Sequence, residues 1–189
     1  FPWVDEHALA SRLSYFLWST MTDAELIALA DRGELRRNLP AQLRRMLDDP
    51  KSEALIQNFT GQWLQARDVE AIDINARAVL AKDDSAGPDT PPAGGRRGQF
   101  GFRQPKFELD RETRLAMRRE TEMFFASIVR EDRRLRDLID ADYTFLNEKL
   151  ARHYGLTNLN LVGPEMRRVA LPKDSPRGGV LTQGTVLTV

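Results

Sequence analysis

One stretch, Leu109–Gly155, constrains the fold more than any other part of the sequence. It begins with a long segment, Asp110–Arg130, in which apolar side chains recur every three or four residues, the spacing of one helix face. A short apolar segment, Leu135–Ile139, comes next, and a third segment stops at Gly155. We predict three consecutive helices here. Their apolar face is the widest in the chain, so the other helices must pack against it to form a core.

The periodicity assigns side chains of this stretch to the inside or the outside. The long helix is expected to bury Leu115, Met117, Thr121, Phe124, Phe125 and Ile128. Its outer face is expected to carry Arg111, Arg118, Arg119 and Glu122, where opposite charges can pair three or four residues apart. After a turn at residues 142–144, the apolar face of the next helix is expected to contain Phe145, Leu146, Leu150 and Tyr154.

Four helices are predicted before residue 66. The first spans Asp5–Trp18, with the aspartate as its cap. The second begins at Thr22, which has a glutamate three residues on and so forms a capping box. The third and fourth begin near Pro40 and Pro50, because proline suits the first turn of a helix. Gly61 lies inside the fourth helix, where we expect a close crossing with another helix.

The periodic pattern is absent between residues 67 and 108. Its centre, Lys82–Gly101, is rich in Pro, Gly, Asp and Arg, and a structureless loop of this length is uncommon in a compact domain. We therefore expect a mobile surface insertion. After Gly155, Met166–Leu171 indicates an extended stretch and Val180–Val189 favours a helix.

Together these segments predict an all-α fold, an irregular bundle of six or seven helices with a long mobile insert and a short irregular C-terminal segment. The expected parts are the N-terminal helices (1–66), the insert (67–108), the central helical hairpin (109–155) and the irregular tail (156–189). We interpret them as one domain of a longer protein, because the sequence opens on Phe1 rather than Met and stops within an apolar run.

Composition excludes several classes of function. The 28 basic and 28 acidic side chains cancel, which argues against a broad basic field for nucleic acid. There is no Cys, so disulfides, thiolate catalysis and covalently attached haem are excluded within this chain. No apolar run approaches the roughly 20 residues of a transmembrane helix.

No motif points to a metal, a cofactor or a reaction. The two histidines, His7 and His153, are far apart, and Glu148 and His153 are five residues apart, whereas paired helical ligands are three or four apart. Glu120 and Glu122, two apart on a helix, do not face each other. The nucleophile motif Gly-x-Ser-x-Gly and the phosphate-binding P-loop are absent. We expect no metal or cofactor site in this chain.

Four stretches together resemble a known family. They are Ala10–Trp18, Asn58–Leu64, Asp140–Gly155 and Arg177–Gln183. They are similar to uncharacterised helical domains within large exported planctomycete-type cytochrome c proteins. The resemblance spans about Asp5 to Val189 and departs chiefly at the insert, Lys82–Gly101. It implies a periplasmic or cell-surface location and a redox neighbourhood. Haem c would belong to neighbouring domains or chains, because the haem-binding Cys-x-x-Cys-His segments of that family lie outside the part matched here.

Two hypotheses follow for the function. The first is a non-catalytic scaffold or docking domain of a periplasmic c-type cytochrome assembly, which contacts other protein chains or domains. Its expected partner-binding residues are Trp3, Trp18, Val186, Leu187 and Val189. The alternative is a domain of a haem-linked exported enzyme that acts on polysaccharide. Its candidate catalytic residues are Tyr143, Asn147, His153 and Arg177. The enzyme hypothesis requires these four to converge in one concave pocket, and the scaffold hypothesis expects them in caps and turns.

Overall fold

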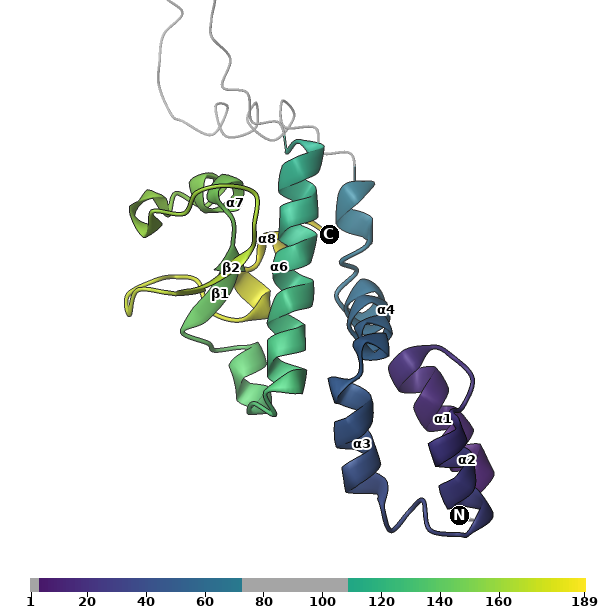
Figure 1. The fold of residues 1–189 in the computed structure, drawn as a ribbon. Helices are drawn as coiled ribbons and strands as arrows, with labels where there is room; N and C mark the ends of the chain where they lie inside the picture. Colours follow the sequence, from purple (N-terminus) through teal and green to yellow (C-terminus); the bar gives the residue numbers. More distant parts are fainter. Residues whose placement is uncertain (1–3, 73–108) are drawn as a thin grey trace, which may run out of the picture.

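The computed structural model of the chain describes residues 4–72 and 109–189. A group of four N-terminal helices lies beside a second group that surrounds one long helix, α6 (Figure 1). In chain order the helices and strands are α1 (Glu6–Trp18), α2 (Ala24–Asp31), α3 (Leu39–Asp48), α4 (Glu53–Trp63), α6 (Arg111–Arg130), β1 (Tyr143–Leu146), α7 (Glu148–His153), β2 (Arg167–Ala170) and α8 (Gly184–Thr188). Short 3-10 turns occur at Pro50–Ser52, Asp68–Glu70, Leu135–Leu138, Thr157–Leu159 and Val180–Thr182.

The N-terminal helices begin at aspartate caps. Asp5 accepts a hydrogen bond from the Ala8 N–H at 2.8 Å, as predicted. The cap of α2 is Asp23, which accepts from the Leu26 N–H at 2.9 Å. The predicted start at Thr22 is therefore one residue early. These helices enclose a core of their own, in which Leu26, Leu35 and Met46 are fully buried.

Gly61 has a different role from the predicted one. A Cβ added there would lie 3.0 Å from Nε of Arg67, whose Nε also donates to the Gly61 carbonyl oxygen at 3.1 Å. The glycine therefore makes room for an arginine side chain from the following loop. The expectation of a helix crossing at this position is wrong.

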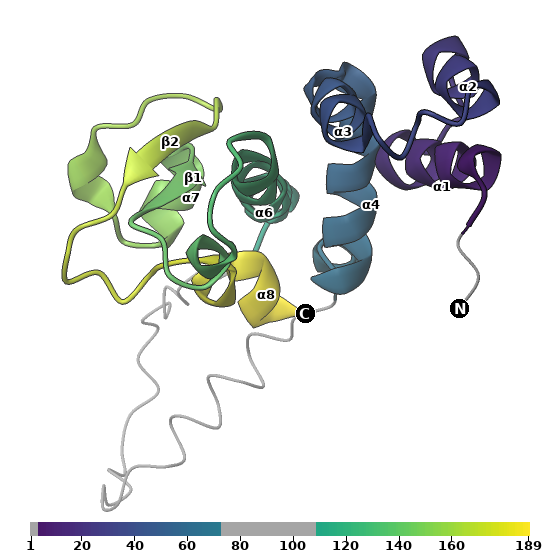
Figure 2. The same cartoon turned by 90° about the horizontal axis from the view of Figure 1, so that it is seen from below.

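Helix α6 is the axis of the second group, with α4 along one side and the sheet and α7 along another (Figures 1 and 2). Asp110 caps it by accepting from the Thr113 N–H at 2.8 Å. Most of the predicted inner face is buried, including Met117, Phe124 and Ile128. Leu115 is an exception, because it is exposed beside α7. Glu122, predicted on the outer face, is buried next to Arg118 at 2.8 Å.

The prediction of an all-α fold is wrong, because β1 and β2 form a two-stranded antiparallel sheet (Figure 1). Tyr143 pairs with Ala170 and Leu146 with Arg167. The residues predicted as the start of a helix face, Phe145 and Leu146, belong to β1. All four residues of β1 are buried, so the strand has no alternation of apolar and polar side chains. A short apolar run of this kind cannot be distinguished from a buried helix segment by periodicity.

The C-terminal segment follows β2 and turns back toward α6. The extended stretch predicted at Met166–Leu171 is confirmed by β2, and the helix favoured after residue 180 is confirmed in α8. Gly179 forms the turn with φ +71°, and a Cβ there would lie 2.3 Å from the Ile139 carbonyl oxygen. The predicted insertion at Lys82–Gly101 lies outside the described residues. In the part of the chain that is described, no helix has the length and apolar character needed to cross a bilayer.

Candidate functional site

A glutamate, Glu120, lies inside the molecule where α6 meets β1 and α7. It is 1% exposed. Oγ1 of Thr144 donates to one carboxyl oxygen at 2.6 Å, and the hydroxyl of Tyr154 donates to the other at 2.5 Å. Burial disfavours the charged form and raises the pKa of Glu120 to about 7, although both hydrogen bonds act in the opposite direction.

Arg177, in the C-terminal segment, lines the same small cavity as Glu120, and its charge lowers the pKa of that carboxyl group. Its guanidinium carbon lies 3.6 Å from the centre of the Tyr154 ring, and Nη1 donates to the Thr182 carbonyl oxygen at 2.7 Å. The Tyr154 hydroxyl also accepts a hydrogen bond from the Gly184 N–H, at the start of α8, at 2.8 Å. Tyr154, at the end of α7 and bonded to Glu120 of α6, therefore contacts the C-terminal segment at both Arg177 and Gly184.

We refer to Glu120, Thr144, Tyr154 and Arg177 as the Glu120 cluster. The cavity beside it has a volume of about 10 Å³, close to the minimum for a single water molecule. Burial and the neighbouring carboxyl group raise the pKa of Tyr154, so its hydroxyl remains protonated and able to donate. The cluster joins elements of the fold and has no room for a substrate.

The structure does not bring the four candidate catalytic residues together. Tyr143 is buried, and its hydroxyl shares a hydrogen bond of 2.9 Å with Oγ of Ser127. Asn147 is the cap of α7, where its side chain accepts from the Leu150 N–H at 2.8 Å. Both are engaged in structural hydrogen bonds within or beside β1.

His153 is the last residue of α7, and Arg177 approaches this end of the helix from the C-terminal segment. Partial burial, and then the charge of Arg177, lower the pKa of His153. Of the four candidates, Arg177 alone lines the small cavity, and Asn147 alone lines the larger groove described next. The convergence that an active site requires is therefore not found in these four residues.

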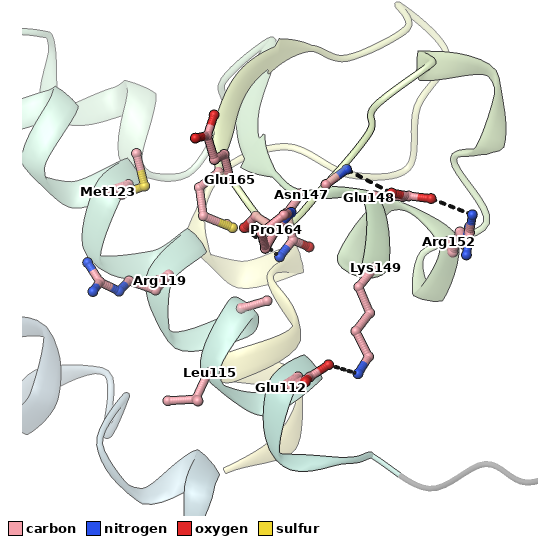
Figure 3. A pocket seen from close by; sticks show the side chains of 13 residues that line it. Glu112, Leu115, Arg119, Met123, Asn147, Glu148, Lys149, Arg152, Pro164 and Glu165 are labelled. Carbon is pink, nitrogen blue, oxygen red and sulfur yellow. Dashed lines mark hydrogen bonds and ion pairs between the residues drawn. The ribbon is translucent and has the colours of Figure 1, made fainter.

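The larger groove lies between α6, α7 and the loop before β2, and has a volume of about 1050 Å³ (Figure 3). Helix α6 contributes Leu115, Arg119 and Met123 to one wall. These are four residues apart, so they form a stripe along the helix. Met166 and Pro164 provide apolar surface on the other side. We call this feature the α6–α7 groove.

Most charges of the α6–α7 groove are paired. Nζ of Lys149 lies 2.5 Å from the carboxylates of both Glu112 and Asp110, and this hydrogen bonding lowers the pKa of Asp110 to about 2. Glu148 pairs with Arg152 and also accepts from the Gly163 N–H at 2.7 Å.

Arg119 is the exception. It has no ion pair among the described residues, and Figure 3 shows it extending from α6 away from the pair formed by Glu112 and Lys149. Within the described parts of the chain, the groove therefore has a positive charge without an ion pair, set between two apolar side chains.

The predicted partner-binding residues have different environments. Trp18 is 2% exposed, and its Nε1–H donates to the Met46 carbonyl oxygen at 2.8 Å. Trp18 is therefore part of the N-terminal core, and the prediction that it faces a partner is corrected. Val186 is half-buried, whereas Leu187 and Val189 are exposed. Trp3 lies outside the described residues.

Potential metal ligands in the described part of the chain are scattered. Among residues 4–72 and 109–189, no group of three or more His, Asp or Glu side chains is placed to bind a metal ion. His7 is exposed, with Nε2 3.4 Å from a carboxylate oxygen of Asp31. The sequence has no Cys, so thioether attachment of haem does not fit this chain.

The sequence analysis did not identify Glu120 as a buried residue or Arg119 as a residue that lines a groove. In the run Arg118-Arg119-Glu120-Thr121-Glu122, charged and polar residues are consecutive, which is typical of a solvated helix face. The sequence does contain one indication that Glu120 is buried. It lies three residues after Met117 and four before Phe124, so it shares the apolar face of the helix with them.

The comparisons with known proteins give one match. The model of the family described as PSD4, protein of unknown function (DUF1592), matches residues 4–156. That range includes Glu120, Thr144 and Tyr154, but not Arg177. No curated protein and no solved structure matches the chain. The match covers most of the sequence, and the chain therefore belongs to the PSD4 (DUF1592) family.

Proposed function

We propose that this domain is a non-catalytic docking domain that binds another protein chain or domain through the α6–α7 groove. The single observation that carries the proposal is the stripe of Leu115, Arg119 and Met123. Residues four apart on a helix are about 6 Å apart along its axis. The groove therefore suits a partner that places a carboxylate between two apolar side chains.

The kinds of side chain in the groove support a protein partner. Arg and Met are enriched in protein–protein interfaces. Met123 and Met166 face the same groove, and the flexible thioether side chain adapts to partners of different shape. An unpaired arginine also gives the interface a charge that selects among partners.

The partner that we propose is a c-type cytochrome domain or chain of a periplasmic or cell-surface assembly. This part of the proposal comes from the resemblance of four sequence stretches to domains of exported cytochrome c proteins. Haem would be held by the partner, since this chain has no Cys. The docking domain would then position haem groups relative to one another.

The environments of the four candidate catalytic residues also favour docking over catalysis. Tyr143 and Asn147 make structural hydrogen bonds, and Arg177 belongs to the Glu120 cluster. An enzyme acting on polysaccharide would need a pocket in which such groups meet. Measured turnover of a polysaccharide by this chain would favour the enzyme hypothesis instead.

A binding experiment tests the proposal. Soluble periplasmic c-type cytochromes of the source organism are passed over the immobilised chain, and retained haem c is measured by its absorbance. We expect retention by the wild type and loss of most of it in Arg119→Glu. Arg111→Glu is the matched control, because Arg111 is an exposed arginine on the same helix but outside the groove. No retention by the wild type, or equal retention by Arg119→Glu, would refute the proposal.

A further inference from the structure

A second, smaller groove lies on the N-terminal helices, where α1 contacts the side of α4 (Figure 2). Its volume is about 330 Å³, at the low end of the range for ligand pockets. The lining residues are Tyr15, Phe16, Ser19, Leu55, Asn58, Phe59 and Gln62. We call it the α1–α4 groove. It shares no residue with the α6–α7 groove or with the Glu120 cluster.

Large aromatic side chains are exposed at the α1–α4 groove. Tyr15 is 59% exposed and Phe16 is 60% exposed. Phe59 is fixed from behind by Phe125, with the rings stacked at 5.0 Å between centroids. Trp63, 54% exposed, continues the surface, because its ring lies 5.3 Å from that of Phe59. Exposed aromatic side chains that gather in one place mark a binding surface.

The α1–α4 groove also lacks charge. Charged residues make up 30% of the sequence, yet none of the seven lining side chains is charged at neutral pH. A charged ligand group would lose its water here without gaining an ionic partner. The groove therefore fits a ligand that is neutral along its length.

Hydrogen-bond donors complete the α1–α4 groove. Nδ2 of Asn58 donates to Oγ of Ser19 at 3.0 Å, which holds the amide at the rim. The Tyr15 hydroxyl and the Gln62 amide have no partner within the described parts of the chain. A hydroxyl and an amide that are not already engaged can donate to acceptors on a ligand.

We propose that the α1–α4 groove binds a proline-rich segment of another protein in the polyproline II conformation. Such segments dock in aromatic-lined grooves, and they are extended before binding, so little entropy is lost. Proline has no N–H, and a proline-rich backbone therefore offers carbonyl acceptors, which the Tyr15 hydroxyl and the Gln62 amide can satisfy. Its rings are uncharged and pack on aromatic faces.

The experiment titrates the 189-residue chain with decaproline and follows binding by calorimetry and by tryptophan fluorescence. We expect saturable binding of decaproline and none of a glycine–serine decamer of equal length, which lacks the preformed helix. Absence of saturable decaproline binding overturns the proposal. Cellohexaose is titrated in parallel, because a neutral glucan is the other uncharged polymer that could occupy the groove. Saturable binding of cellohexaose in place of decaproline also overturns the proposal.

Variants locate the binding. Phe16→Ala and Gln62→Ala are each expected to weaken decaproline binding about tenfold, the effect of losing one good contact. Both side chains are exposed, so these changes leave the fold intact, which thermal unfolding verifies. Leu135→Ala is the matched control, because it removes an exposed apolar side chain that lines neither groove. Decaproline affinity that is unchanged in both groove variants, or weakened equally in the control, places binding elsewhere and overturns the proposal.

Discussion

Arg119 and Glu120 follow one another on α6, yet the fold gives them opposite environments. Arg119 is exposed at the α6–α7 groove and has no ion pair among the described residues. Glu120 is buried and accepts hydrogen bonds from β1 and from the end of α7. Successive residues of an α-helix point about 100° apart, so one side chain faces solvent and the next faces the neighbouring elements. Inside the molecule the carboxyl group of Glu120 joins elements through hydrogen bonds, and at the surface the charge of Arg119 remains available to a partner.

The largest expected effect concerns the C-terminal segment that the Glu120 cluster holds. Gly179→Ala should lower the free energy of unfolding by about 4 kcal/mol, because the added Cβ meets the Ile139 carbonyl and φ is positive. Urea unfolding followed by circular dichroism measures the change. Gly163→Ala is the control, since φ is +90° but no atom lies within 4 Å of the added Cβ. A cost of only about 1 to 2 kcal/mol is expected there. Equal losses in both variants would show that close packing at Gly179 contributes nothing.

The next effect is a pH dependence of stability, which we expect from buried Glu120 and not from exposed Arg119. The pKa of Glu120 is raised to about 7 from 4.5, so the folded state binds this proton more tightly than the unfolded state. The stabilisation that comes from this tighter proton binding is fully present below pH 4.5 and is lost as the pH rises to 7. The expected loss is about 3 kcal/mol.

The measurement is the difference in unfolding free energy between the wild type and Glu120→Gln from pH 4 to 8. This difference cancels the contributions of other carboxyl groups, such as Asp110, whose lowered pKa acts in the opposite direction. The wild type should lose stability relative to the variant over the interval from pH 4.5 to 7. A difference that stays flat over this interval contradicts a raised pKa for Glu120.

A smaller effect is expected from removing one donor of the Glu120 cluster. Tyr154→Phe leaves a carboxyl oxygen of Glu120 and the Gly184 N–H without their partner, and should cost about 2 kcal/mol. Tyr143→Phe is the matched control, because Ser127 keeps its bond to the Phe124 carbonyl at 2.8 Å. Chemical unfolding compares the two variants. If the control costs as much as Tyr154→Phe, the cluster has no special role in stability.

The smallest effect on stability is expected for exposed Arg119. Arg119→Ala should change the free energy of unfolding by less than about 0.5 kcal/mol, since the side chain is exposed and has no ion pair with any described residue. Thermal unfolding of the two proteins provides the test. A loss well above about 1 kcal/mol would mean that Arg119 stabilises the fold, and the contrast with Glu120 would fail.

Much of the helical part of the fold could be predicted from the sequence. Asp5 caps the helix that it was expected to cap, because capping depends on atoms within one turn. The strand at Tyr143–Leu146 could not be predicted, since its pairing partner is more than twenty residues away. The groove around Arg119 was missed for a similar reason, as its opposite wall comes from the loop before β2.

The sequence by itself determined the cap of the first helix and that this chain has no thiol chemistry, because both depend on residue type and near neighbours. Only the tertiary structure decided that Glu120 is buried and Arg119 exposed. Both lie in a run of charged and polar residues that has the pattern of a solvent face. Hydrogen bonds from Thr144 and Tyr154, distant in the chain, compensate for the burial of Glu120, and that compensation exists only once the elements are packed together.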